Sequence, residues 1–327
     1  MHHCEMGPGN RMSTSAPPAA RSVKAKQRPA DRIFSASTTI AGILILIALA
    51  AVAVFLVAES IPALIADPAE LPRQPDSFWS YVGPLVFGTV WAAFLALLMA
   101  LPLSLGIALF ISHYAPRRIA QGLGYIIDLL AAVPSVVYGL WGVKVIAPLI
   151  TPFYTYLVST FGWFPLFTGP ASGTGRTILT VAIVLAVMII PIITALSREI
   201  FLQTPTLHEE AALALGATRW EMIQMAVLPF GRPGVVSAAM LGLGRALGET
   251  MVVAMVLSPA VVISFVLTGS QNPNTIAGNI ALNFPDASGI GVNVLIATGL
   301  ILFIITLIIN SIARYAVNRR KEFSGAN

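Results

Sequence analysis

Ala238–Val253 reads AAMLGLGRALGETMVV, an apolar run that is punctuated by glycine and carries two full charges near its middle, Arg245 and Glu249. The wider stretch Pro233–Leu257 is long enough to cross a bilayer as a helix. A charge at the centre of a spanning helix costs about 3 kcal/mol on insertion scales, so such residues usually serve a site or a pathway. Because they are four residues apart, the two side chains are predicted to share one helical face and to neutralise each other in part. The arginine indicates a path for something polar, and its charge favours an anion.

The composition of the whole chain indicates a membrane protein. Hydrophobic residues make up 57% of the 327 residues and charged residues only 10%, whereas about a quarter of a soluble domain is charged. Six stretches approach the roughly 20 apolar residues that one spanning helix needs. They are Ile40–Ala58, Val82–Ile111, Ile119–Gly142, Thr177–Leu196, Pro233–Leu257 and Val292–Ala313. The sequence therefore predicts an all-α membrane protein with six transmembrane helices.

The distribution of Lys and Arg predicts the orientation of these helices. From the N-terminal tail through the successive connections to the C-terminal tail, the counts of basic residues are 6, 1, 2, 2, 3, 0 and 4. Because basic residues accumulate on the cytoplasmic side, this alternation predicts that both termini are cytoplasmic. The pI near 9.6 is then a consequence of topology. Nucleic-acid binding is not indicated, because no basic patch is interleaved with base-stacking aromatic residues.

The ends of the chain are predicted to lie outside the membrane domain. Residues 1–35 are rich in Pro, Ser, Ala and basic residues, which is typical of a disordered tail. We expect a transmembrane domain over residues 36–315 and a second cytoplasmic tail over residues 316–327. His2, His3 and Cys4 stand together near the start, but they lack further ligands for a metal, and Met12 is an alternative start.

The two long connections on the predicted outer side differ in character. Val143–Arg176 is dense in aromatic residues, which favours a segment lying at the membrane interface, or alternatively a lid or docking surface. Ser258–Gly291 contains the polar, turn-rich run Gly269–Asn274, and we expect it to be an exposed loop.

The segment 204–229, between the predicted fourth and fifth spans, is typical of a helical hairpin. Thr206 with Glu209, and Thr218 with Glu221, match the capping box that satisfies the free amides at a helix start. Gly216 stands between them where a left-handed helix end favours glycine, and Pro229 is expected to end the second helix. The hairpin is rich in apolar residues yet too short to span. These residues either pack on the chain's own spans or insert into a groove on a cytosolic partner.

The same hairpin carries a resemblance to a known family. Glu210-Ala211-Ala212, followed by Gly216 and then by Leu228-Pro229, resembles the EAA loop of ABC importer permeases, although Ala226 stands where the family usually has isoleucine. Three further stretches are similar to the phosphate-specific permeases of the PstC type. These are Ala131–Gly142, Pro191–Glu199 and Leu241–Thr250. The resemblance implies a type I ABC importer permease fold and places the chain in the plasma membrane.

The resemblance also implies partner proteins, and it implies that one of them hydrolyses ATP while this chain forms the translocation path. Such permeases pair with a second, PstA-like permease, two copies of a cytosolic ATPase and an extracytoplasmic phosphate-binding protein. The chain itself would have no catalytic residue, metal or cofactor, since the partner ATPase uses ATP and magnesium. It would translocate inorganic phosphate, with Arg245 and Glu249 on the pathway and Glu210, Ala211, Ala212, Gly216, Leu228 and Pro229 coupling it to the ATPase.

The glycines around Arg245 predict close helix packing. Gly244 and Gly248 form one small-residue row, and Gly242 forms a second row with Ala238 and Ala246. Such rows let backbones approach closely, either between subunits or within this chain. Asp128 lies within the predicted third span, where it either pairs with a basic residue such as Arg117 or lines the path.

Other functions remain open from the residues alone. The Arg245–Glu249 pair is alternatively a buried ion pair that locks two helices. The chain is alternatively a permease for another oxyanion or small solute. An ion-coupled secondary transporter is a further alternative, but it predicts matching internal repeats, which we do not find.

Overall fold

The computed structural model describes residues 29–72 and 76–321, with side chains for residues 33–72 and 76–315. The chain divides into two units, Met1–Val52 and Ala53–Asn327, and the second contains every feature described below except the larger part of α1. Most of the predicted N-terminal tail lies outside the described residues, including His2, His3, Cys4 and Met12. The end of the predicted C-terminal tail, residues 322–327, lies outside them too.

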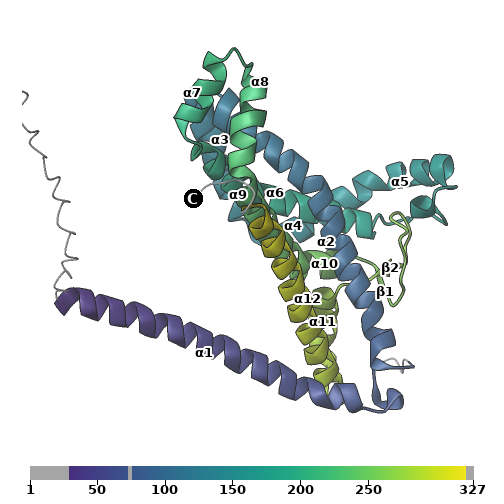
Figure 1. The fold of residues 1–327 in the computed structure, drawn as a ribbon. Helices are drawn as coiled ribbons and strands as arrows, with labels where there is room; N and C mark the ends of the chain where they lie inside the picture. The colour runs from purple at the N-terminus through teal and green to yellow at the C-terminus, as the bar shows by residue number, and fades with distance from the viewer. Residues whose placement is uncertain (1–28, 73–75, 322–327) are drawn as a thin grey trace, which may run out of the picture. The chain divides into compact units, whose positions relative to one another are not determined.

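The described residues are almost entirely helical (Figure 1). The long helices are α1 (Pro29–Ile65), α2 (Phe78–Leu109), α3 (Arg117–Ala131), α5 (Ala147–Phe161), α6 (Ile178–Leu202), α9 (Leu228–Leu247) and α12 (Ile290–Lys321). The shorter helices are α4 (Ser135–Trp141), α7 (Thr206–Ala214), α8 (Arg219–Met222), α10 (Met251–Val256) and α11 (Ile276–Asn283). Three π-helical turns continue neighbouring helices, namely η2 (Phe110–Tyr114), η3 (Gly142–Ile146) and η5 (Ile223–Val227). Three 3-10 turns, η1 (Pro68–Glu70), η4 (Pro165–Phe167) and η6 (Phe284–Asp286), lie in connections.

Six helical stretches of the described chain are long and apolar enough to cross a membrane. They are Ile33–Ile65, Phe78–Tyr114, Ser135–Phe161, Ile178–Leu202, Arg219–Leu247 and Ile290–Tyr315. The predicted number of spans is confirmed, and the first, second, fourth and sixth stretches cover nearly all of their predicted counterparts. The fifth ends at Leu247, ten residues before the predicted end at Leu257, so that part of the prediction was wrong.

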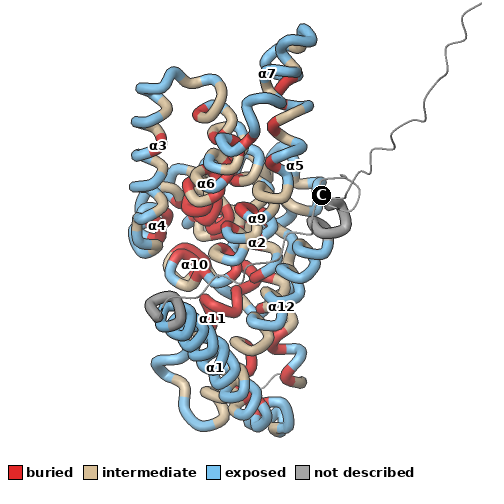
Figure 2. The backbone as a smooth tube through the Cα atoms, turned by 60° about the vertical axis from the view of Figure 1, so that its left-hand side comes forward, coloured by how far each residue is buried: buried red, intermediate tan, exposed pale blue. Residues whose placement is uncertain are grey.

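Helix α6 is the most buried of the spans, and its surroundings form the core. Two thirds of the residues in its apolar segment are buried, against fewer than a third in the apolar segments of the other five spans. Side chains such as Leu185, Ile189 and Ile193 are fully buried on α6. They pack against small residues of α2, including Ala96 and Ala100, which allow the two helices to approach closely. Figure 2 shows the buried residues gathered around α6, α2, α9 and α10, with a further group at α11.

Two hydroxyl groups link α2 and α6 inside this apolar core. The Ser104 hydroxyl donates to the carbonyl of Ile190 over 3.3 Å, and the Thr194 hydroxyl donates to the carbonyl of Ser104 over 3.5 Å. Both residues are fully buried. Where no water is available, such interhelical bonds satisfy groups that would otherwise be costly to bury.

The predicted third span, Ile119–Gly142, is not one helix, and this prediction was wrong. Helix α3 ends at Ala131, and α4 begins at Ser135 after a break. Pro134 causes the break, because its ring clashes with the preceding helical turn and holds the residue before it away from helical geometry. The stretch long and apolar enough to span is Ser135–Phe161, which runs on through α5.

The outer connections also differ from expectation. Residues 147–161 of the aromatic connection form helix α5, which projects away from the other helices in Figure 1. In the connection predicted to be an exposed loop, Asn272–Asn279 is buried instead. The Asn272 side chain donates to the carbonyls of Arg176, Ser258 and Gly269 and accepts from the amide of Ile178. These bonds fold the connection back onto the start of α6, where strands β1 (Pro259–Ala260) and β2 (Asn272–Pro273) pair in parallel.

Candidate functional site

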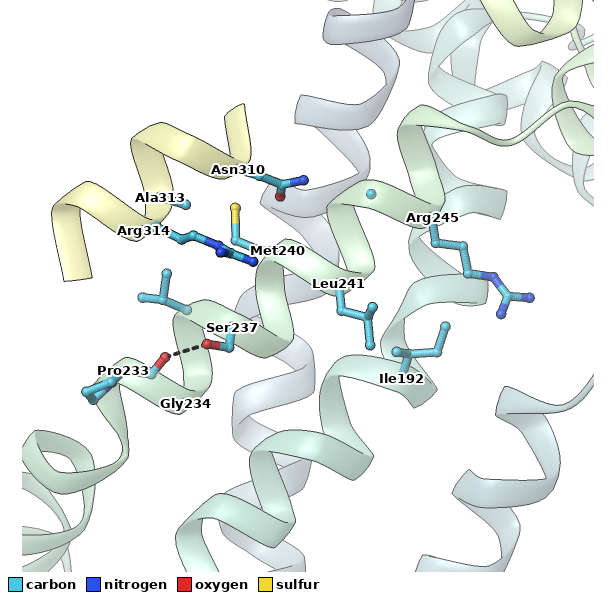
Figure 3. Close-up of a pocket in the computed structure, with 12 residues that line it drawn as sticks. Ile192, Pro233, Gly234, Ser237, Met240, Leu241, Arg245, Asn310, Ala313 and Arg314 are labelled. Atoms are coloured by element: carbon cyan, nitrogen blue, oxygen red, sulfur yellow. Dashed lines mark hydrogen bonds between the residues drawn. The ribbon is translucent and has the colours of Figure 1, made fainter. Parts of the chain in front are cut away.

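Arg245 occupies the last turn of α9, partly exposed, and its side chain borders a cavity of about 1020 Å³. The cavity runs along one face of α9, because Ser237, Leu241 and Gly244 recur at helical spacing among its lining residues. Ile192 of α6 and the end of α12 also line it. Figure 3 shows the Arg245 guanidinium extending away from α12. The predicted intramembrane arginine therefore lies at a cavity large enough for a small hydrated anion.

Glu249 does not partner Arg245, which corrects the prediction from their spacing. Helix α9 ends at Leu247, and Gly248 is its C-cap, so the two charged residues do not share a helix. Glu249 is buried, and its Oε1 accepts hydrogen bonds of 3.1 Å from the amides of Met251 and Val252. These amides open α10 and have no partner within that helix. The carboxylate therefore caps α10, where the positive end of a helix favours a negative charge.

The two predicted glycine rows have different surroundings. Gly242 is buried between Ala238 and Ala246 on the face toward α6, and a Cβ there would lie 2.7 Å from Cδ1 of Ile193. This row packs against a helix of the same chain. Gly244 borders the cavity and has no atom within 4 Å of a Cβ, and Gly248, which ends the helix, is exposed. Of the two rows, only the one with Gly244 and Gly248 lies on an exposed face.

The hairpin is present, although its caps differ in part from the prediction. The amide of Glu221 donates to the Thr218 hydroxyl, and the amide of Thr218 donates to the Glu221 carboxylate, which confirms the second capping box. Gly216 has a φ of +88°, as predicted for the end of α7. The first capping box was wrong: α7 begins at Thr206 after Pro205, and no side chain caps it.

The second arm of the hairpin does not stop at Pro229, which was a further wrong prediction. Helix α8, the π-turn η5 and α9 form one continuous helical stretch from Arg219 to Leu247. Pro229 follows the π-turn η5 closely, and such a local π adjustment accommodates a proline that lacks an amide hydrogen inside a helix. The hairpin is therefore joined by continuous helix to the segment that carries Arg245.

The hairpin divides its apolar residues between two surfaces. Met222, Ile223 and Val227 are buried against Ala108 of α2 and Phe201 of α6. Leu207, Leu215, Trp220 and Met225 are exposed, and Leu215 is 90% exposed. Of the predicted coupling residues, Glu210, Ala211 and Pro229 are exposed, while Ala212 and Leu228 are half-buried. One face of the hairpin thus packs on the chain's own spans, and the other face is exposed.

A polar contact that the sequence did not reveal joins the hairpin to α2. Nε2 of His113, in the π-turn that continues α2, lies 3.4 Å from Oε1 of Glu209 on α7. The Ser112 hydroxyl lies 2.7 Å from Nδ1 of the same ring and holds its orientation. His113 and Glu209 are 96 positions apart, and no pattern in a single sequence predicts a contact over that separation. Glu209 makes it in place of the cap that was predicted.

Asp128 lies on α3, exposed, outside the span as the structure has it. In the described part of the chain, the contact of His113 with Glu209 is the only one within 4.0 Å between a basic and an acidic side chain. The predicted pairing of Asp128 with Arg117 is therefore absent from this structure. Eleven residues along one helix separate these two side chains by about 16 Å.

Comparison with known proteins identifies the family. Residues 100–322 match the family described as the binding-protein-dependent transport system inner membrane component. The chain belongs to this family. It is 43% identical over 307 residues to the phosphate transport system permease protein PstC 2 of Mycobacterium tuberculosis, covering 89% of this chain and 94% of that relative. It is 39% identical over 308 residues to PstC of Mesorhizobium japonicum, covering 90% and 92%.

Solved structures of similar fold are also ABC importers. A bacterial ABC transporter involved in the import of the acidic polysaccharide alginate superposes with a TM-score of 0.59, covering 89% of this chain and 96% of that chain at 16% identity. The inward-facing MetNI methionine ABC transporter superposes with a TM-score of 0.54, covering 73% and 95% at 17% identity. At this identity the likeness shows the fold alone, and it confirms the predicted importer permease fold.

Proposed function

We propose that the chain is the membrane permease subunit of an ATP-driven importer and that it carries inorganic phosphate across the plasma membrane. Its similarity to PstC permeases over nine tenths of its length supports the substrate. The observation that carries the mechanism is Arg245, an arginine on a spanning helix at a cavity of about 1020 Å³. A planar guanidinium matches the oxygen geometry of phosphate, to which it can donate two hydrogen bonds at once.

The exposed face of the hairpin supports the proposal that a partner protein, the ATPase, docks there. This exposed apolar face, including Leu215 and Trp220, is of the kind that inserts into a protein groove. In this proposal two copies of a cytosolic ATPase serve the complex, and this permease docks on one of them. A PstA-like permease covers the open Gly244 side of α9, and an extracytoplasmic phosphate-binding protein delivers the substrate. No catalytic step, metal or cofactor is assigned to this chain.

Closure of the ATPase would act on Arg245 through one helical stretch. Because α8 continues through η5 into α9, a displacement of the hairpin would also move the lining of the cavity. The bond between Glu209 and His113 would pass the same displacement to α2. Alternating access then requires only that α9 and α2 move relative to a partner permease.

The test is phosphate uptake by the complete complex in proteoliposomes, energised by ATP and supplied with the binding protein. Arg245→Ala is expected to abolish uptake, because no other cation remains at that end of the cavity among the described residues. Complex assembly on a sizing column should be unchanged.

A matched control is Arg232→Ala, since Arg232 is exposed on α9 but does not line the cavity. Normal uptake by the Arg245→Ala complex would refute the pathway. A wild-type complex that hydrolyses ATP and transports another oxyanion, but not phosphate, would instead favour the alternative substrate.

A further inference from the structure

The cavity beside α9 contains a second arginine that the pathway described above does not use. Arg314, on α12, lines the same cavity as Arg245. None of the residues that line the cavity in the described chain is acidic, so the two guanidinium groups give it a net charge of two. No carboxylate of the described residues lies within 4.0 Å of either arginine. A cavity of this charge attracts anions along its length.

Polar groups accompany Arg314 on both walls of the cavity. Asn310 precedes it by four residues and shares its face of α12, and Figure 3 shows both side chains directed toward α9. On the facing side, the Ser237 hydroxyl donates to the carbonyl of Pro233 over 3.0 Å, which leaves its oxygen lone pairs free to accept. Arg314 and Asn310 offer donors, and Ser237 offers an acceptor for the proton of monobasic phosphate.

The polar groups that line the cavity lie at two levels along α9. Figure 3 shows the Arg314 side chain directed toward α9, whereas Arg245 points away from α12. Ser237 and Arg245 are eight residues apart on α9, which is about 12 Å along a helix. Bulky Leu241 lies between them on the cavity wall. The geometry therefore separates two positions along one passage.

We propose that Arg314, with Asn310 and Ser237, forms a second phosphate-binding position that receives the anion from Arg245 on its way to the hairpin end of the protein. This inference rests on the proposed function. Successive sites of moderate strength let an ion enter readily and still leave, whereas a single strong site would retain it. Arg314 also lies nearer to the predicted cytoplasmic end of α12, so the order along the path is Arg245 first and Arg314 second.

The test separates a binding role from the general preference for basic residues on the cytoplasmic side. In the complete reconstituted complex, Arg314→Ala is expected to lower phosphate uptake per ATP hydrolysed about tenfold, the effect of losing one charge-assisted hydrogen bond. ATP hydrolysis stimulated by the binding protein should stay at the wild-type rate. Asn310→Ala should lower the same ratio by a smaller factor.

Two further variants keep the result interpretable. Arg314→Lys retains the charge that topology requires but loses the planar fork, so uptake per ATP should fall between wild type and Arg314→Ala. Arg232→Ala removes a basic residue from the same end of the protein without touching the cavity and should match wild type. Full uptake by Arg314→Ala, or full rescue by lysine, would overturn the second position. A wild-type complex that takes up no phosphate would instead refute the proposed function itself.

Discussion

At the scale of single residues, the charges near Arg245 have separate tasks. Arg245 borders the cavity, while Glu249 is buried and accepts two backbone amides at the start of α10. A buried carboxylate without such donors would be costly, so these amides stabilise it where it lies. The glycine between the helices, Gly248, ends α9 and turns the chain so that Glu249 faces α10 instead of Arg245.

This arrangement predicts how substitutions of Glu249 affect stability. Glu249→Gln keeps an oxygen that can accept from the amides of Met251 and Val252, so the complex should melt close to the wild-type temperature. Glu249→Ala removes the cap and should destabilise the chain by about 1 kcal/mol or more, the usual value of a helix N-cap. Thermal unfolding of the purified complex in detergent measures both. Equal destabilisation by the two substitutions would contradict the capping role.

At the scale of elements, the hairpin has one buried face and one exposed face. Its buried face, with Ile223 and Val227, packs on α2 and α6, and its other face is exposed and apolar. Helix α8 continues into α9, and α7 contacts α2 through Glu209 and His113. A short element is thereby tied to two spanning helices at once.

The exposed face of the hairpin predicts a site whose alteration leaves the fold intact. Leu215 is 90% exposed, so Leu215→Asp removes no packing within this chain and should leave the melting temperature within about 1 °C of wild type. The same substitution should weaken co-purification of the ATPase at least about tenfold, because a charge would enter an apolar groove.

Ile223→Ala is expected to lower the stability of the chain, in contrast to Leu215→Asp, because Ile223 is fully buried. It should lower stability by about 2 to 5 kcal/mol through loss of core packing. Retention of the ATPase by the Leu215→Asp complex at the wild-type level would place the docking face elsewhere.

At the scale of the whole molecule, the spans and their order follow the hydropathy of the chain, and their interruptions follow proline and glycine. Four predicted spans correspond to helical stretches, the fifth ends at Leu247 instead of Leu257, and the third was displaced toward the C-terminus by the break at Ala132–Pro134. Asp128 was assigned to the membrane because that break was not anticipated. The orientation of the helices remains a prediction from the basic residues alone.

The orientation can be checked by labelling single cysteines. In a Cys4→Ser background, Ser324→Cys lies in the C-terminal tail and Ser288→Cys in the connection between the last two spans, which contains no basic residue. Because basic residues stay in the cytoplasm, an impermeant thiol reagent should label position 288 in intact cells and position 324 only after permeabilisation. Labelling of position 324 in intact cells would reverse the topology.

The sequence by itself determined the membrane class, the number of spans, the hairpin with Gly216 and its second capping box, and the presence of an arginine within a span. Each depends on local properties: hydropathy summed over a helix, backbone freedom at glycine and side-chain caps within one turn. Only the tertiary structure decided that Glu249 caps α10, that Glu209 meets His113 and that Arg314 shares a cavity with Arg245. These contacts depend on where helices end and on which faces meet, and such choices are made by packing between residues far apart in the chain.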